Sequence, residues 1–324
     1  MEDSKTILKV KNLTKTFTIK SKKIMGKPAY LKAVNNVSFE VHEGETVGVI
    51  GESGCGKSTL GKLILNLIPA TSGTVEFDGK DIYSLPSAEM TKLRSDMNMI
   101  FQDPYSSLDP RKTAAYSIEE PMIIHNIGTP EERKQRVNEL LKVVGLDEYH
   151  GIRFPHEFSG GQRQRINIAR ALALNPKLLV CDEPVSALDV SVQAQVINLL
   201  KELKKKMKLT YIFISHDLGV VKYISDRIVI MYLGTVVEVG NSAEIYANPK
   251  HPYTKALFSA IPPSSPLEQK EKIKLTGEIP SPLNMPKGCA FCTRCPYATE
   301  RCRIETPTLR NVDERHQVAC FLED

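Results

Sequence analysis

Tryptophan is absent from this sequence, and aromatic residues make up only 6% of its 324 residues. Long hydrophobic runs are missing as well: the longest apolar stretches, such as residues 228–233, are of strand length and far below the roughly 20 residues that cross a bilayer. The first five residues are polar and no apolar segment follows them, which argues against a secretory signal peptide. We therefore expect any membrane role to depend on a partner.

A strong excess of charge is also missing. Lys and Arg number 43 against 38 Asp and Glu, a net charge of +5. Residues 1–32 hold nine lysines against Glu2 and Asp3, a local +7, so the remaining 292 residues carry −2. The basic surface that nucleic-acid binding requires is therefore not expected, and nor is a nucleic-acid partner. We interpret the N-terminal lysines as a solvated edge, with contact to anionic lipid as the alternative.

The composition that remains is ordinary for a globular protein, 41% hydrophobic and 25% charged, over a length that suggests about two domains. Short apolar runs alternate with amphipathic stretches, which is the pattern of a largely parallel sheet covered by helices. The expected strands are 46–50, 178–181 and 211–215, and the expected helices are 58–68, 130–145, 193–208 and 241–257.

Residues 51–59 fit the phosphate-binding pattern G-x-x-x-x-G-K-[ST], between an apolar strand and a helix. The glycines let backbone N–H groups close around phosphate oxygens, and the helix N-terminus favours the anion. Lys57 would supply charge to the β- and γ-phosphates, and Ser58 a hydroxyl to Mg²⁺. Cys55 is interpreted as a small residue that fits the loop, with an activated thiolate as the alternative. The predicted nucleotide-binding residues of this loop are Gly51, Glu52, Ser53, Gly54, Cys55, Gly56, Lys57, Ser58 and Thr59.

The apolar run 178–181 ends in two carboxylates. Such a strand end would place Asp182 near Mg²⁺ and leave Glu183 free to polarise water. Five further features stand in a fixed order around it: Phe17, Gln102 in Ile100-Phe-Gln-Asp103, Ser159-Gly160-Gly161-Gln162, Ser186-Ala-Leu-Asp189, and His216 in Ile214-Ser-His-Asp217.

Together these features resemble the ATP-binding-cassette (ABC) ATPases over about residues 7–240. In that family they correspond to the adenine-stacking aromatic, the Q-loop, the signature motif, the D-loop and the switch histidine. Phe158 departs from the leucine that usually precedes the signature serine. The resemblance implies catalytic roles for Glu183, His216 and Gln102, with Gln102 joining Ser58 at Mg²⁺. It implies ATP contacts for Phe17, Asp182, Asp189 and the signature residues Ser159, Gly160, Gly161 and Gln162.

The fold implied by the resemblance is an α/β P-loop ABC ATPase. It has a mostly parallel core sheet with helices, an antiparallel β subdomain and a helical signature subdomain at about 103–165, and a small Cys-rich C-terminal appendage follows. A serine and two glycines that open a helix form a second anion site made of N–H groups. Two ATPase subunits are therefore expected to face head to tail, each completing the other's nucleotide site.

The composition shifts near residue 262, where residues 261–266 are rich in proline and serine. We expect a nucleotide-binding domain at 1–261 and a C-terminal extension at 262–324. The segment 241–257, with His251-Pro-Tyr-Thr254, and the segment 101–110 resemble the ATPases of oligopeptide and dipeptide importers.

That second resemblance implies ATP-driven import of di- or oligopeptides. The implied partners are a second, often non-identical ATPase subunit, two membrane permeases and an extracytoplasmic solute-binding protein. The implied location is the cytoplasmic face of the membrane. The groove around residues 102–111 would receive a permease helix, so changes at Tyr105 or Leu108 are expected to uncouple transport. Related solutes such as nickel chelates or glutathione stay open, and so does an ABC ATPase with a zinc module that acts on nucleic acid or ribosomes.

Five of the seven cysteines lie beyond residue 285. Disulfides are not expected in a reducing compartment, and clustered thiolates are typical ligands of Zn²⁺ or of an iron–sulfur cluster. The importer resemblance implies a [4Fe–4S] cluster, with zinc as the alternative, and maps its ligands onto Cys289, Cys295, Cys302 and Cys320. Cys292 departs from the family pattern and is either a replacement ligand or a spare thiol.

Overall fold

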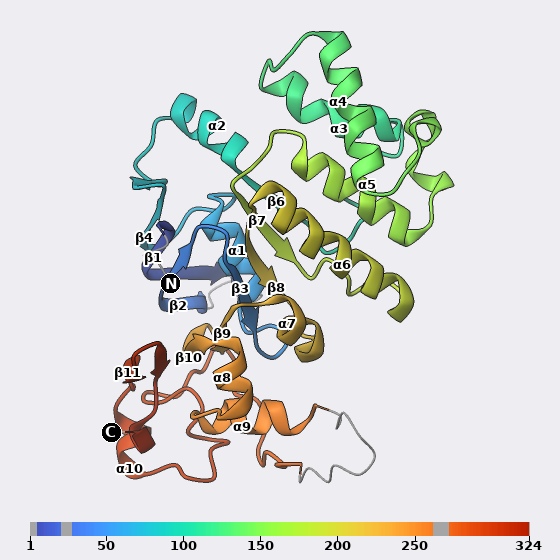
Figure 1. Ribbon diagram of the computed structural model, residues 1–324. Coiled ribbons are helices and arrows are strands. Elements are labelled where there is room, and N and C mark those ends of the chain that lie inside the picture. The colour runs from blue at the N-terminus through green and yellow to red at the C-terminus, as the bar shows by residue number, and fades with distance from the viewer. Residues whose placement is uncertain (1–4, 21–27, 262–271, 324) are drawn as a thin grey trace. The chain divides into compact units, whose positions relative to one another are not determined.

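The computed structural model describes residues 5–20, 28–261 and 272–323, and the chain divides into two compact units. As far as they are described, the first unit comprises residues 1–5, 42–46 and 84–215, and the second comprises 6–41, 47–83 and 216–324. Figure 1 labels most of the helices and strands of both units.

The first unit contains a parallel run of strands and a helical subdomain. Strand β6 pairs in parallel with β7, and β7 with β8. Every residue of β7 and β8 is buried, which explains why their sequences are continuous apolar runs. Helix α3 packs against α4 and α5, and the three form the helical subdomain. The elements are α2 (Ser87–Asp96), β6 (Met97–Ile100), α3 (Ala114–Ile124), α4 (Pro130–Val143), η1 (Glu148–Ile152), η2 (Pro155–Glu157), α5 (Gly160–Leu172), β7 (Leu178–Asp182), α6 (Val190–Met207) and β8 (Thr210–Ile214).

The second unit contains two sheet regions. One is a four-stranded sheet of order β2-β1-β4-β5, in which β1 pairs antiparallel with β4 and β4 with β5. In the other, β3 is parallel to β9, and β9, β10, β12 and β11 follow in antiparallel pairs. The elements are β1 (Thr6–Ile19), β2 (Ala29–His42), β3 (Thr46–Ile50), α1 (Lys57–Ile64), β4 (Ser72–Phe77), β5 (Lys80–Asp81), α7 (Leu218–Ile224), β9 (Arg227–Tyr232), β10 (Thr235–Asn241), α8 (Ser242–Ala247), α9 (Pro252–Ser259), α10 (Glu300–Ile304), β11 (Arg310–Asp313), β12 (His316–Val318) and η3 (Phe321–Glu323).

These elements confirm the expected α/β fold, with parallel core strands, an antiparallel β subdomain and a helical subdomain. The three expected strands are present as β3, β7 and β8. Helix α4 confirms the helix expected at 130–145: Thr129 and Glu132 form a capping box, and Val137, Leu140 and Leu141 are buried.

Three expected helices differ from the structure. Helix α6 begins at Val190, three residues before the expected start at 193. Helix α1 ends at Ile64, four residues before the expected end, because Asn66 takes a left-handed conformation with φ 49°. The single helix expected at 241–257 is wrong: α8 ends at Ala247 and α9 begins at Pro252. The break lies at Asn248, which precedes Pro249 and has non-helical φ and ψ of −144° and 70°.

The C-terminal segment 272–323 lies within the second unit, which also contains the phosphate loop. Its strand β12 pairs with β10, with Val318 opposite Glu238, so the segment extends a sheet edge. The domain boundary expected near residue 262 falls outside the described residues, which resume at 272.

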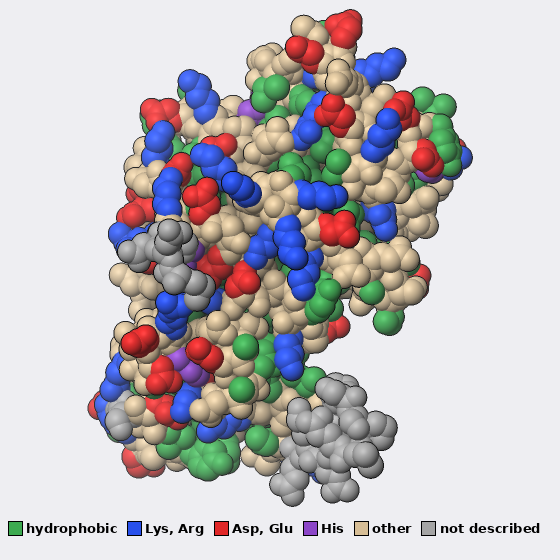
Figure 2. All heavy atoms as spheres, in the orientation of Figure 1, with side chains coloured by type: hydrophobic (Ala, Val, Ile, Leu, Met, Phe, Trp, Pro, Cys, Tyr) green, Lys and Arg blue, Asp and Glu red, His purple; other side chains and the backbone are tan. Residues whose placement is uncertain are grey.

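The distribution of charged side chains and the character of the helices both match what the composition predicts. Figure 2 shows lysine and arginine side chains interspersed with aspartate and glutamate over the face in view. Among the described residues, no helix combines the length and the apolar character needed to cross a membrane.

Candidate nucleotide site

The phosphate loop between β3 and α1 has the backbone that its glycines were expected to permit. Gly51, Gly54 and Gly56 all have positive φ, and Gly56 caps the N-terminus of α1. A Cβ at Gly51 would lie 2.2 Å from the Met231 carbonyl oxygen, and one at Gly56 would lie 2.0 Å from the Ala33 carbonyl oxygen. The loop therefore excludes side chains at both positions and leaves its backbone free to cradle an anion.

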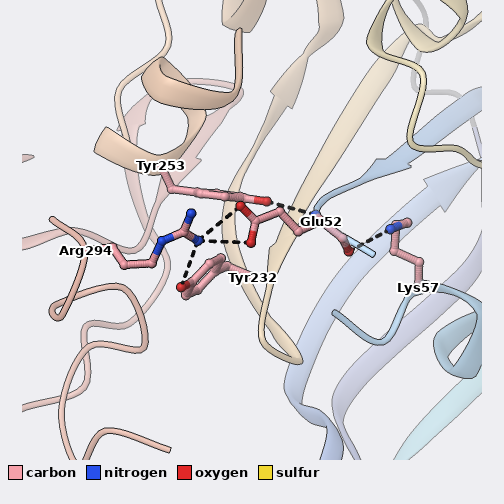
Figure 3. Close-up of polar contacts among 5 residues, drawn as sticks. All are labelled: Glu52, Lys57, Tyr232, Tyr253 and Arg294. Atoms are coloured by element: carbon pink, nitrogen blue, oxygen red, sulfur yellow. Dashed lines mark hydrogen bonds and ion pairs between the residues drawn. The ribbon is translucent and has the colours of Figure 1, made fainter. Parts of the chain in front are cut away.

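Lys57 is held inside this loop. Its side chain is buried, and Nζ donates to the carbonyl oxygens of Gly51 at 2.7 Å and Glu52 at 3.0 Å. Figure 3 shows Lys57 pointing toward the backbone of Glu52. The ammonium also lies 3.8 Å from Cys55 Sγ. It can exchange these loop partners for phosphate oxygens, which accept stronger, charge-assisted hydrogen bonds from it.

Cys55 is a packing residue of the loop. Its side chain is buried, and Gly234 N donates to its carbonyl oxygen at 2.9 Å. Burial raises the pKa of the Cys55 thiol, and the opposing effect of Lys57 is smaller. Burial in this loop therefore favours the neutral thiol over an activated thiolate.

In the first unit, two residues assigned to catalysis meet. Gln102, which follows β6, donates from Nε2 to Glu183 Oε2 at 2.9 Å. Glu183 has left-handed backbone with φ 46°, and its N–H donates to the Ile214 carbonyl oxygen. Glu183 thus has a strained backbone directly after β7, while Asp182 is buried at the end of β7.

The signature motif opens α5 as expected. Ser159 is the N-cap: its Oγ accepts from Gln162 N at 3.3 Å, while Gln162 Oε1 accepts from Ser159 N at 3.0 Å. Ser159 is exposed, and Phe158 is buried where the family usually has leucine. A Cβ at Gly161 would lie 2.4 Å from Val192 Cγ1, so α6 requires glycine there.

The remaining predicted ATP contacts are accessible. Phe17 is 37% exposed on β1, with Lys15 Nζ 5.1 Å from its ring centroid. Asp189 is exposed and precedes α6. His216 is exposed between β8 and α7. The phosphate loop, Phe17 and His216 belong to the second unit, and Gln102, Asp182, Glu183, the signature residues and Asp189 belong to the first.

The segment that follows Gln102 is anchored to α5. Asn167 Nδ2 donates to the Pro104 carbonyl oxygen at 3.2 Å, and Arg170 donates to the Ser107 carbonyl oxygen. Tyr105 is 56% exposed, whereas Leu108 is buried. The two residues expected to act alike at a coupling surface therefore differ, because Leu108 is part of the core.

The His251-Pro-Tyr-Thr254 motif has a structural explanation that its sequence did not supply. His251 Nδ1 accepts from Tyr253 N at 3.0 Å and caps α9, and burial lowers the pKa of His251 to about 4. Tyr253 is buried, and its hydroxyl accepts from Glu52 N of the phosphate loop at 2.9 Å. The motif thus places a tyrosine against the nucleotide site.

The five C-terminal cysteines gather at one place. Cys289, Cys292, Cys295, Cys302 and Cys320 all line one small cavity of about 10 Å³. In the described part of the chain, however, no three His, Cys, Asp or Glu side chains are arranged to hold a single metal ion. A thiol set around one cavity has the donor chemistry of a Cys₄ site, and the cavity admits only about one water, so the side chains must spread for a larger group.

Comparisons with known proteins agree with these motifs. A family model described as "ABC transporter" matches residues 34–186, and one described as "Oligopeptide/dipeptide transporter, C-terminal region" matches residues 237–302. A solved structure titled as the dimeric, post-hydrolysis state of the ATP-binding cassette MJ0796, bound to ADP and Pi, is 35% identical. It has a TM-score of 0.65 and covers 73% of this chain and 99% of its own. The fold and the nucleotide-site motifs define an ABC ATPase.

Relatives that align over nearly the whole chain identify a narrower group within this family. The Oligopeptide transport ATP-binding protein AppF of Bacillus subtilis is 50% identical over 99% of this chain and 98% of its own. The Oligopeptide transport ATP-binding protein OppF of Salmonella typhimurium is 51% identical over 100% of this chain and 98% of its own. The chain belongs to the ABC transporter family, in the group of ATP-binding proteins that carry the oligopeptide/dipeptide transporter C-terminal region.

Proposed function

We propose that this chain hydrolyses ATP to drive the import of di- or oligopeptides through partner membrane permeases. The observation that carries the proposal is the near-full-length identity to relatives named for oligopeptide transport, together with the C-terminal region match at 237–302. The Pseudomonas aeruginosa relative named as a Di/tripeptide transport ATP-binding protein, 47% identical over 97% of this chain, supports the same substrate class.

The proposed chemistry assigns each motif one task. Lys57 and the loop N–H groups bind the β- and γ-phosphates, and Phe17 stacks on adenine. Ser58, Gln102 and Asp182 would hold Mg²⁺, which neutralises phosphate charge when it is bound. Glu183 orients and deprotonates the attacking water. Its left-handed backbone and its hydrogen bond from Gln102 support this role, because they fix where the carboxylate lies.

The proposed assembly pairs two ABC ATPase subunits with two permeases on the cytoplasmic face of the membrane, and a solute-binding protein delivers the peptide. Ser159 is exposed at the N-terminus of α5, which suits contact with the γ-phosphate bound by the other ATPase subunit. His216 would contact the γ-phosphate, and Asp189 would lie at the subunit interface. A second, homologous ATPase subunit is proposed as the partner.

Coupling to the permeases should depend on Tyr105. Its ring is exposed, with the Arg163 guanidinium 5.1 Å from its centroid, so Tyr105→Ala removes contact area without opening the core. In the reconstituted complex, Tyr105→Ala is expected to lower peptide uptake at least about ten-fold, while ATP affinity stays within about two-fold. Uptake of labelled peptide and nucleotide titration measure the two quantities.

Tyr223→Ala is the matched control, because this tyrosine of α7 is 53% exposed and lies outside the segment that follows Gln102. It should leave uptake unchanged. Normal uptake by Tyr105→Ala would contradict the coupling role, and failure of the complex to import any peptide would contradict the proposed substrate class.

We further propose that the C-terminal thiols hold a [4Fe–4S] cluster with Cys289, Cys295, Cys302 and Cys320 as ligands. The gathering of these thiols around one cavity supports the proposal. The role would be structural, because a cluster would join residues near the start and the end of a segment that has little regular structure.

The cluster can be tested by colour and metal content. Anaerobically purified protein should be brown and contain iron, and Cys302→Ala should lose both while Mg·ATP binding persists. Cys292→Ala is the matched variant, because the Cys292 thiol lines the same cavity but stands outside the ligand pattern. The Cys292→Ala protein should therefore retain its iron. Colourless protein with stoichiometric zinc and no iron would contradict the proposal.

A further inference from the structure

The phosphate loop is held from its outer side by the C-terminal segment. Arg294 Nη1 donates to both carboxylate oxygens of Glu52, at 3.1 and 3.0 Å, and to the Tyr232 hydroxyl at 3.3 Å. The Arg294 side chain is only 9% exposed and that of Glu52 is 26% exposed. Figure 3 shows the Glu52 carboxylate pointing toward Arg294, while its backbone carbonyl faces Lys57.

Glu52 therefore connects the phosphate-binding lysine to the C-terminal region. Its carbonyl oxygen accepts from Lys57 Nζ at 3.0 Å, and its N–H donates to the Tyr253 hydroxyl at 2.9 Å. Its side chain pairs with Arg294. Every polar group of this residue is engaged, one on the phosphate-binding lysine and two on the C-terminal region, so the loop cannot move at Glu52 without breaking one of these contacts.

We propose that Arg294 is a positioning residue for ATP binding, which acts through Glu52 to preorganise the phosphate loop. Without the guanidinium, the Glu52 carboxylate would be partly shielded from water with no cation beside it. Rotation of the carboxylate toward water relieves this desolvation cost. That rotation frees the backbone at Glu52 and with it the resting site of Lys57. ATP must then order the loop as it binds, so affinity falls.

This role affects binding more than turnover. Once phosphate oxygens hold the loop N–H groups and Lys57, the loop is ordered whether or not Arg294 is present. The catalytic step then proceeds from the same bound geometry. The Michaelis constant should rise and kcat should change little, which is the result expected when ground-state and transition-state binding weaken together.

The segment around Arg294 has its own anchor, so the variant should fold. Phe291 is buried, and its ring centroid lies 5.2 Å from that of Tyr232 and 5.5 Å from that of Tyr253. The rings of Tyr232 and Tyr253 lie 4.7 Å apart. This aromatic cluster of Phe291, Tyr232 and Tyr253 holds the segment three residues before Arg294, independently of the ion pair.

The test measures ATP affinity, KM and kcat, and the melting temperature without nucleotide. Arg294→Ala should raise Kd and KM about ten-fold or more, with kcat within about two-fold. Arg294→Lys should recover part of the loss, because all three contacts are made by one nitrogen that an ammonium can replace. Glu52→Gln should weaken ATP binding as well, and adding Arg294→Ala to it should cost little more, since the two residues act as one pair.

Arg303→Ala is the matched control. It removes an arginine from the same segment, where the side chain is 57% exposed and pairs with Glu300. It should leave ATP affinity, KM, kcat and the melting temperature unchanged. Unchanged ATP affinity in folded Arg294→Ala, a loss confined to kcat, or additive effects of the two single changes would overturn the proposal. If Arg294→Ala does not fold, unchanged affinity in Glu52→Gln overturns it equally.

Discussion

Replacing Glu183 by glutamine is expected to lower ATP hydrolysis by roughly two to four orders of magnitude, the scale of losing a general base. The amide keeps the size of the side chain, and its carbonyl oxygen can still accept from Gln102 Nε2, now 2.9 Å from Glu183 Oε2. ATP binding should therefore be unchanged. The variant should accumulate as an ATP-bound dimer, because closure no longer ends in hydrolysis. Phosphate release under saturating ATP measures the effect.

Glu202→Gln provides the control for this experiment. Glu202 is an exposed carboxylate on α6 in the same unit, and its replacement makes the same chemical change away from the site. It should hydrolyse ATP at the normal rate. Hydrolysis by Glu183→Gln within a few-fold of the unmodified protein would remove Glu183 from the mechanism and shift the role of base to another group.

The local structure of the nucleotide-site motifs could be predicted from sequence because each motif is local. The glycine pattern at 51–56 requires a particular backbone wherever the chain places it, and the positive φ values at Gly51, Gly54 and Gly56 follow from it. The capping box at Ser159 and Gln162 is likewise set by residues three apart. Buried parallel strands appear as apolar runs, so β7 and its terminal carboxylates were predictable too.

Contacts between distant residues could not be predicted in this way. Arg294 and Glu52 are 242 residues apart, and no pattern in either segment marks the other as its partner. The hydrogen bond between Tyr253 and Glu52 N is equally non-local. The importer resemblance placed Leu108 at a groove that receives a permease helix, but its side chain is only 4% exposed. Burial of a loop residue depends on what packs over it, and the local sequence does not carry that information.

The predicted helix at 241–257 fails for a different reason. The segment contains a proline at 249, and the residue before proline disfavours helical backbone. Asn248 has non-helical backbone, in agreement with this rule, and His251 then caps a new helix at Pro252. The local signal for two helices was therefore present in the sequence, at the proline that follows Asn248.

Gly56→Ala is expected to destabilise the protein by about 3 kcal/mol or more, well above the ~1 kcal/mol cost of a left-handed alanine. Gly56 has φ 104°, and its added Cβ would lie 2.0 Å from the carbonyl oxygen of Ala33 on β2. Both atoms belong to backbone, so relief requires moving either the strand or the loop. The melting temperature without nucleotide should fall by several degrees. ATP affinity should fall at least about ten-fold, because the displaced loop also caps α1.

Gly79→Ala is the control for this experiment, because it introduces the left-handed backbone strain without the steric clash. Gly79 has φ 78° in the turn between β4 and β5, and a Cβ there would meet nothing within 4 Å. Its replacement should cost only the ~1 kcal/mol of left-handed strain and should leave ATP affinity unchanged. Equal destabilisation by Gly56→Ala and Gly79→Ala would mean that β2 yields to the loop without cost. Close packing around Gly56 would then not be what sets the geometry of the phosphate site.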